Sequence, residues 1–374
     1  MNLRLWQNPW RLMLAVNAAV FVGVFLHKIA LPPFVPYIHL VVDYHFGFTK
    51  RALVGAAVSL FTAKVPVWLV FALAGVIWLI TRALFAHLFR RTFGFGDKQL
   101  PLFVFMAGSP FFLKNFMHTL GHFDIYGWLL AICLLLIPAQ SVGYVLLAAM
   151  FSVVLVLIHH IHVLMYVPTI AAIVALRHYL IRGITPQNAF AGAAALALSA
   201  ALFIATQCYG TVDAPPQAFV DHLQNRRADP SRTALLSFAY IWYQPLSKEI
   251  ADTWARLPHN ILGIPVFALL IWLHTPLWRY FAGMVRALAN ETHRRIVISA
   301  LVVVSAGYLV MFAIVFDYSR WVSNWAVCMI LILHAVKTLP ASPDTPLVPT
   351  DDTSTTILGA IITLIPRGGI VRPF

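Results

Sequence analysis

The sequence predicts an all-α protein that crosses a membrane several times, and two properties of the chain support this fold class. Of its 374 residues, 61% are hydrophobic and only 10% are charged, and the mean hydropathy is +0.82. A soluble fold carries a charged fraction nearer a quarter. The apolar residues also gather in stretches about as long as a bilayer-spanning helix requires. We therefore expect a polytopic transmembrane helical protein with about ten spanning helices and additional interfacial helices.

The apolar stretches give the expected order of the spans. The first, 11–31, is long for a signal-peptide core and is followed by no convincing small-residue cleavage site, so it is expected to be retained. The stretches 100–113 and 163–176 are short, which predicts tilted, broken or partly re-entrant helices there. The complete set is 11–31, 65–86, 100–113, 124–138, 142–158, 163–176, 186–207, 260–277, 296–316 and 321–338.

The distribution of basic residues predicts the orientation. If the N-terminus is cytoplasmic, the inner connections collect most of the loop arginines and lysines, as the positive-inside rule requires. We therefore expect a multi-pass protein of the inner (cytoplasmic) membrane whose N-terminus is cytoplasmic. The residues that fall on the inner side are Arg4, Arg11, Arg82, Arg90, Arg91, Lys98, Arg177, Arg182, Arg279, Arg286, Arg294, Arg295 and Lys337.

The net charge of +13 does not predict nucleic-acid binding. Most basic residues are spread over inner loops, where anionic lipid is their expected partner, and no basic motif with interleaved aromatic residues is present. The cysteines are Cys133, Cys208 and Cys328, an odd and scattered set that argues against a disulfide framework or a cysteine metal site. The expected partners therefore include membrane lipids but no nucleic acid.

Residues 1–338 are expected to form the transmembrane domain, which includes one long outer segment, 208–259. Its piece 248–257 is amphipathic, with opposite charges four residues apart, and is expected to lie along the outer interface. The segment is also rich in aromatic residues, which stack on sugar faces or form an interfacial belt. They are Phe238, Tyr240, Trp242, Tyr243 and Trp254.

Residues 339–374 are expected to form an inner linker and an interfacial tail. The part 339–356 is rich in Pro, Asp, Ser and Thr, a composition typical of a flexible linker. The apolar run 357–365 is short for a span. Crossing would also place Arg367 and Arg372 outside, so we expect this run to lie at the membrane interface.

Four of the expected outer junctions carry carboxylate, imidazole or cationic side chains. Ionisable groups at membrane depth are costly and usually face a polar cavity or a partner, so we expect these residues to converge in one extracytoplasmic pocket. The simpler alternative is that each caps a helix end or lies among headgroups. The junctions supply Asp43, Tyr44, Lys50 and Arg51; Lys114, His118, His122 and Asp124; His159, His160 and His162; and Asp317 and Arg320.

Glycosyl transfer from a lipid-phosphate-linked sugar fits this residue set. A carboxylate takes the proton of the acceptor hydroxyl, and cations stabilise the departing phosphate, for which guanidinium groups are well suited. The candidate catalytic residues are Asp43 and, as alternatives, Asp124 and Asp317. The candidate substrate-binding residues are Tyr44, Lys50, Arg51, His118, His122, His159, His160 and Arg320.

Two other chemistries fit the residue set less well than glycosyl transfer. The pair His118 and His122 is similar to the first histidine box of membrane di-iron desaturases, but the chain lacks their H-x-x-H-H boxes and places its histidines outside, so no metal ligand is assigned. A transporter normally keeps its site near the midplane, whereas the predicted spans are nearly free of ionisable groups at mid-depth.

Three short motifs carry a resemblance to known proteins. The run Asp43 to Gly55, D-Y-H-F-G-F-T-K-R-A-L-V-G, resembles the G-F-x-[KR]-R-[GA]-L-x-G run in the first outer loop of bacterial polytopic proteins encoded with surface-polysaccharide genes. The run 121–124, G-H-F-D, resembles their G-[RH]-F-D motif, and 317–321, D-Y-S-R-W, resembles their D-[WY]-x-R-W motif. The order and positions of the motifs agree.

That group is similar to glycosyltransferases of the C superfamily and to polysaccharide polymerases, which use polyprenyl-phosphate donors on the outer side. The resemblance implies a periplasmic active site in which Asp43, in the first outer loop, is the base. It also implies a lipid-linked sugar donor and a saccharide or lipid acceptor as partners. Because Asp43 stands alone where the superfamily has an acidic pair, the need for a divalent metal stays open. The alternatives are a transporter of lipid-linked sugars or protons and a non-catalytic partner in polysaccharide assembly.

Overall fold

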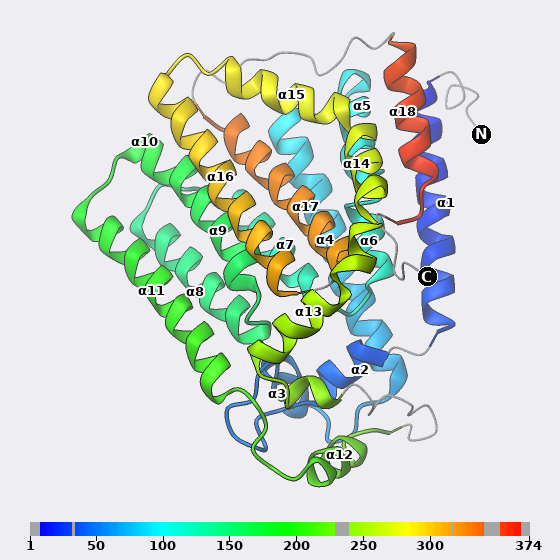
Figure 1. The fold of residues 1–374 in the computed structure, drawn as a ribbon. Helices are drawn as coiled ribbons and strands as arrows, with labels where there is room; N and C mark the ends of the chain where they lie inside the picture. The colour runs from blue at the N-terminus through cyan, green and yellow to red at the C-terminus, as the bar shows by residue number, and fades with distance from the viewer. Residues whose placement is uncertain (1–7, 32–33, 229–238, 316, 340–351, 368–374) are drawn as a thin grey trace.

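The computed structural model describes residues 8–31, 34–228, 239–315, 317–339 and 352–367 (Figure 1). Their secondary structure is helical throughout, apart from an isolated bridge between Val65 and Arg227. The all-α fold class is therefore confirmed. Several helices are long and apolar enough to cross a bilayer, so this is a multi-pass membrane protein.

Within the described residues, six helices pass a length and hydropathy test for spanning. They are α1 (Pro9–Ile29), α4 (Val67–Phe93), the continuous run His162–Arg182 that joins α9 (His162–Val174), η3 (Ala175–Tyr179) and α10 (Leu180–Arg182), α11 (Pro186–Tyr209), α16 (Glu291–Ile314) and α17 (Tyr318–Lys337). The pair α13 (Leu246–Ile261) and α14 (Ile264–Leu273), bent by 80°, gives a seventh if it is one broken span.

The expected number of about ten spans is not confirmed, for reasons visible in the missing members. The stretch 124–138 forms α7 (Asp124–Leu136), with 13 residues, and 142–158 forms α8 (Val142–Ile158), with 17. A helix rises only about 1.5 Å per residue, so both are short for a bilayer. The stretch 100–113 is broken into α5 (Leu100–Ala107) and α6 (Leu113–His118), as its length predicted, and 260–277 is divided between α14 and α15 (Thr275–Arg286).

The helices pack in an order that places α7, α9 and α17 at the centre. Helix α11 packs on α8 and α8 on α9, while α9 also contacts α7, α16 and α17. The core between them is rich in large rings, of which Trp128, Tyr166 and Tyr308 are fully buried. Figure 1 shows α12 (Pro216–Asn225), α2 (Phe34–Val41) and α3 (Leu53–Ser59) gathered at one end of this bundle and α15 at the other. We call these the α12 end and the α15 end.

The α12 end has a second, smaller core. Tyr37, Val42, Phe219 and Trp242 belong to it, and Trp242 donates its indole N–H to the Lys50 carbonyl. Here α2 and α3 lie so close that a Cβ on Gly55 would fall 1.9 Å from the Val42 carbonyl oxygen. Only glycine fits such an approach, which explains the last residue of the Asp43–Gly55 run.

The last described helix, α18 (Thr353–Leu364), begins at Asp352, which caps its first turn by accepting from Ser354 N–H, and it packs along α1 and α5. The fully buried ammonium of Lys114 donates to the carbonyl oxygens of Ile362, Thr363 and Ile365. A cation at the C-terminus of a helix satisfies carbonyls that have no partner within the helix. The helix contains most of the run 357–365; its placement at a membrane interface stays a prediction.

Candidate functional site

Three connections between helices surround one cavity of about 280 Å³. The α6–α7 loop supplies His122, the α8–α9 loop His159, and the α16–α17 junction Asp317 and Arg320. The loop before α3 and the start of α13 complete the wall. The polar side chains of the lining are Arg51, His122, His159, Tyr240, Gln244, Glu249, Asp317 and Arg320.

At the cavity, the Arg320 guanidinium lies between two carboxylates. Its Nε and Nη2 donate to Asp124 at 2.7 and 2.9 Å, a forked contact, and its Nη1 donates to Asp317 at 3.0 Å. Asp124 is only 1% exposed, so this ion pair stands largely without water. Two-pronged contacts of this kind are strong and fix the geometry. Asp124 is thereby committed to joining α7 to α17.

The same network continues into the bundle through two neutral side chains. Asn324, one turn after Arg320, donates to Asp124 Oδ2 at 3.3 Å and accepts the Tyr166 hydroxyl at 2.7 Å. The Tyr166 ring lies so close to α7 that a Cβ on Gly127 would come within 2.3 Å of it. Gly127 therefore makes room for the tyrosine that completes the network.

Arg51 differs from Arg320 in having no carboxylate contact among the described residues. It lines the cavity, and its buried Nε meets no described hydrogen-bond acceptor. Its φ is +61°, a value that no other non-glycine residue in the described ranges adopts. The left-handed conformation costs such a residue on the order of 1 kcal/mol and tends to occur at functional sites. Burial lowers the pKa of this guanidinium.

Lys50, the neighbour of Arg51, points elsewhere. Its ammonium donates to the Gln244 carbonyl at 2.7 Å and lies 3.4 Å from Glu249 Oε1, and its side chain is 2% exposed. Burial lowers its pKa to about 8, although the Glu249 carboxylate opposes the shift. Lys50 thus fastens the segment before α13 to the cavity wall, and its predicted contact with a substrate phosphate stays a prediction.

The imidazoles beside the cavity are buried, and apolar side chains lie next to them. His39 stacks on Phe123 with ring centroids 4.0 Å apart, and His159 lies 5.2 Å from His160. Burial lowers the pKa of His122 to about 3 and that of His159 and His160 well below 6.5. These side chains are therefore neutral at pH 7, and among them only His122 and His159 line the cavity.

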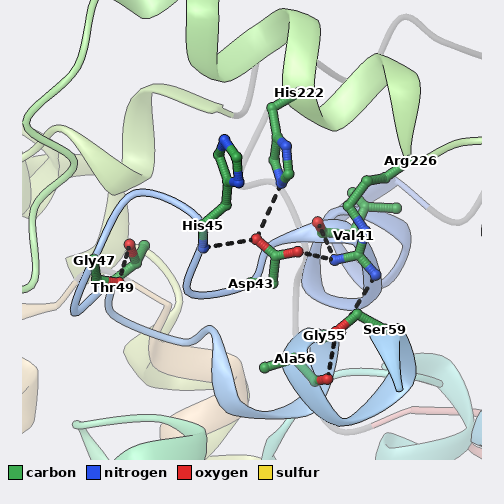
Figure 2. A network of polar contacts seen from close by, with 10 residues as sticks. All are labelled: Val41, Asp43, His45, Gly47, Thr49, Gly55, Ala56, Ser59, His222 and Arg226. Atoms are coloured by element: carbon green, nitrogen blue, oxygen red, sulfur yellow. Dashed lines mark hydrogen bonds and ion pairs between the residues drawn. The ribbon is translucent and has the colours of Figure 1, made fainter. Parts of the chain in front are cut away.

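Asp43, the expected base, belongs to a second polar cluster (Figure 2). Its Oδ2 accepts from Arg226 Nη1 at 2.8 Å, and its Oδ1 lies 3.0 Å from His222 Nε2 and accepts from the His45 backbone N–H. The His45 and His222 rings are stacked with centroids 4.3 Å apart. Arg226 also donates to the Val41 carbonyl. The cluster ties α12 to the loop after α2, and Asp43 does not line the cavity among the described residues.

Two further candidates also lie outside the cavity lining. His118 accepts from Arg367 Nη1 at 2.9 Å, close to the end of α18. Tyr44 stacks with Phe48, and burial raises the pKa of its hydroxyl. The structure therefore brings together Arg51, His122, His159, Asp317 and Arg320, with Asp124 directly behind them. It separates them from Asp43, Tyr44 and His118.

Several residues of the two clusters were not singled out by sequence reasoning. Asn324 had a detectable signal, because an amide one turn after Arg320 on an otherwise apolar helix shares the face of the arginine. Glu249 lies within the amphipathic piece 248–257 and resembles an ordinary solvent-facing charge. The others are Tyr166, Gln244, His222 and Arg226. Phe238, one of the predicted aromatic residues, lies outside the described residues.

Within the described ranges, no group of three or more His, Cys, Asp or Glu side chains is arranged to hold a metal ion. The cysteines in these ranges are free thiols.

The cavity combines two guanidinium groups, two carboxylates, two neutral imidazoles and the ring of Tyr240. That set suits an anionic ligand that also carries hydroxyl groups. Comparison of the chain with protein-family models, curated proteins and solved structures found no match.

Proposed function

We propose that this protein is a membrane-embedded glycosyltransferase. In this proposal it takes a sugar from a polyprenyl-phosphate or polyprenyl-pyrophosphate donor and transfers it to a saccharide or lipid acceptor, in the synthesis of a cell-surface polysaccharide or glycolipid. The reaction takes place in the cavity beside Arg51 and Arg320, and the α12 end faces the periplasm. The observation that carries the proposal is the Arg51 guanidinium, a cation at the cavity whose backbone is strained and which contacts no carboxylate of the described residues.

A phosphate group is the ligand that would complete this arrangement. Arg320 already shares two carboxylates, so its charge is offset within the protein, whereas the buried Nε of Arg51 meets no described acceptor. A buried donor left without an acceptor costs about 1 to 3 kcal/mol, and a phosphate oxygen supplies that acceptor with an opposite charge. Leaving-group phosphate gains most from such a contact, because its charge grows as the glycosidic bond breaks.

The surroundings of the cavity favour an enzyme over a transporter. One turn along α7 from Asp124, the fully buried Trp128 packs against Phe85, Phe112 and Phe116. These rings give the network an apolar neighbour within the bundle. Alternating access requires a site that opens to both sides of the membrane, whereas sugar transfer requires a cavity open at one end.

The donor assignment is tested with full-length protein in lipid nanodiscs. The probes are undecaprenyl phosphate carrying radiolabelled glucose, galactose or mannose, with octyl glucoside as acceptor. We expect binding and transfer with one of these donors, and a loss of donor affinity of about 10- to 100-fold in Arg51→Ala, the value of a charge-assisted hydrogen bond. Arg279→Ala, an exposed arginine on α15, is the matched control and should bind normally. Absence of both binding and transfer with every donor would overturn the proposal.

The orientation is tested by labelling single cysteines from one side of the membrane. Asp221 on α12 and Arg279 on α15 are both exposed and lie at opposite ends. In intact spheroplasts, a membrane-impermeant maleimide should label Asp221→Cys and leave Arg279→Cys unlabelled until lysis, each variant in a Cys208→Ser background. The reverse pattern would place the cavity on the cytoplasmic side and contradict the proposed location.

A further inference from the structure

We propose that Glu249 is the general base that takes the proton from the acceptor hydroxyl, an assignment that rests on the glycosyl transfer proposed above. Glu249 lies in the first turn of α13 and lines the cavity. Its position is unlike that of the aspartates that the sequence motifs point to. The assignment follows from a comparison of Glu249 with the other proton acceptors at the cavity, which are the imidazoles and the aspartates beside Arg320.

The imidazoles at the cavity are poor proton acceptors at neutral pH. The pKa of His122 is about 3 and that of His159 lies well below 6.5, because burial disfavours the charged ring and the nearby arginines add to the effect. General-base catalysis works best when the pKa of the base lies near the working pH. These rings are therefore suited to hydrogen bonding with a substrate in their neutral form and not to holding its proton.

The two aspartates at the cavity are held by Arg320. Asp124 receives two guanidinium N–H groups and the Asn324 amide, and it does not line the cavity. Asp317 lines the cavity but accepts from Arg320 at 3.0 Å. Protonating either aspartate would weaken the charge balance around the arginine that is expected to meet the phosphate.

Among the described residues, Glu249 and Asp317 each meet one cation through one oxygen, and the contact of Glu249 is the longer of the two, 3.4 Å against 3.0 Å. Its Oε1 lies 3.4 Å from the Lys50 ammonium, whose shorter bond goes to the Gln244 carbonyl at 2.7 Å. No hydrogen bond involves its Oε2 among the described residues, and its side chain is 17% exposed. Lys50 holds the carboxylate in place, and one oxygen remains free to accept a proton within the cavity.

The neighbours of Glu249 suit the binding of a hydroxylated acceptor. Tyr240 and Gln244, from the segment just before α13, also line the cavity. An aromatic ring packs on the apolar face of a sugar, and an amide can both donate to and accept from hydroxyl groups. Arg51 and Arg320 come from other elements of the wall, so the acceptor and the donor phosphate meet different parts of the cavity.

The step balances with these groups alone. The acceptor oxygen forms a bond to the anomeric carbon of the donor as the bond from that carbon to the phosphate oxygen breaks. The hydroxyl proton passes to the free oxygen of Glu249, and the electron pair of the broken bond stays on the phosphate oxygen. Arg51 and Arg320 stabilise the charge that develops there.

The experiment compares Glu249→Gln with wild-type protein in nanodiscs, using the radiolabelled undecaprenyl-phosphate hexoses and octyl glucoside. Removing a general base lowers the rate by about 100- to 10,000-fold, so transfer should fall by at least about 100-fold. Donor affinity should stay within about threefold, since Glu249 does not meet the phosphate in this scheme. Asp221→Asn removes an exposed carboxylate from α12 at the same end of the molecule and should leave transfer unchanged.

A second measurement separates catalysis from a structural role. In Glu249→Ala, added formate should restore part of the transfer activity, because a small carboxylate can occupy the vacated space and accept the proton. Formate should not restore Asp317→Ala. If Glu249→Gln transfers sugar at the wild-type rate, or if formate restores Asp317→Ala instead, the base assignment is overturned while donor binding still supports the proposed function. If wild-type protein neither binds nor transfers, the proposed function itself fails.

Discussion

Asp124 and Asp43 each accept hydrogen bonds from an arginine, yet their settings differ. Asp124 is 1% exposed and joins two helices of the bundle, α7 and α17. The Asp43 side chain is 15% exposed and joins the short helix α12 to a loop. The first pair borders a cavity that also contains a cation without a carboxylate contact, Arg51. The comparison teaches that an Asp–Arg pair indicates a candidate site when a further charged group beside it, here Arg51, is available to bind a ligand.

The largest expected effect is a difference in unfolding free energy between loss of the Asp124–Arg320 pair and loss of the Asp43–Arg226 pair. Asp124→Ala should lower the free energy of unfolding by about 3 to 5 kcal/mol, the cost of breaking a buried ion pair. Asp43→Ala should cost less, about 1 to 3 kcal/mol, because water can reach the groups it leaves behind. Denaturant unfolding in detergent micelles measures both. Equal losses would show that the two ion pairs contribute equally to the free energy of unfolding.

Acid should weaken the cavity region more than the Asp43 cluster. His159 and His160 have a lower pKa when folded than the unfolded value of 6.5, because burial disfavours their charged forms. The unfolded chain therefore binds more protons below about pH 6.5, and stability is lost as the pH falls, by up to about 1.4 kcal/mol per pH unit for each ring.

Unfolding measured at pH 7.5 and 5.5 checks this pH dependence. His159→Gln should flatten it, and His222→Gln should flatten it less, since the pKa of His222 is lowered by burial but raised by Asp43. A steeper loss of stability toward alkaline pH would contradict the sign.

Gly127→Ala tests whether the cavity network depends on the close packing of Tyr166. The added methyl group would collide with the Tyr166 ring, so we expect a loss of about 1 to 3 kcal/mol by overpacking. Gly75→Ala on α4 is the matched control, because a Cβ there meets nothing within 4 Å, and it should be neutral or stabilising. Thermal unfolding of both variants measures the difference. If Gly127→Ala is as stable as the wild-type protein, Tyr166 is free to move.

The smallest expected effect has the opposite sign. Arg51→Gly should raise the free energy of unfolding by up to about 1 kcal/mol, since glycine adopts a positive φ without strain. Arg51→Ala keeps the strain and serves as the comparison. Both variants should lose donor binding. A destabilised Arg51→Gly would show that Arg51 supports the fold and would remove the argument that strain is retained here for a ligand.

The sequence was sufficient for the all-α membrane fold, because composition and apolar stretches report directly on the solvent that a helix faces. Of the residues expected in one pocket, Arg51, His122, His159, Asp317 and Arg320 line the cavity, whereas Asp43, Tyr44 and His118, predicted by the same argument, do not. The number of spans was not predictable in this way. The length of α7 depends on where neighbouring helices end, and hydropathy does not record that.

The placement of Asp43 and Glu249 depended on long-range contacts. Asp43 is 183 residues from Arg226 in sequence and Lys50 is 199 from Glu249, and no local pattern encodes such pairs. Charge spacing in 248–257 predicted an amphipathic helix, which α13 confirms. It gave no sign that one of its carboxylates faces inward.

The Lys114 contact constrains how the chain is assembled during synthesis. Its acceptors follow it by 248 to 251 residues, so a ribosome must add all of these residues before the ammonium gains them. Until then the earlier helices hold a cation whose burial is unfavourable, and their final packing has to wait for α18. Shortened forms that end before residue 362 should consequently be recognised as unfinished and removed by membrane quality-control proteases.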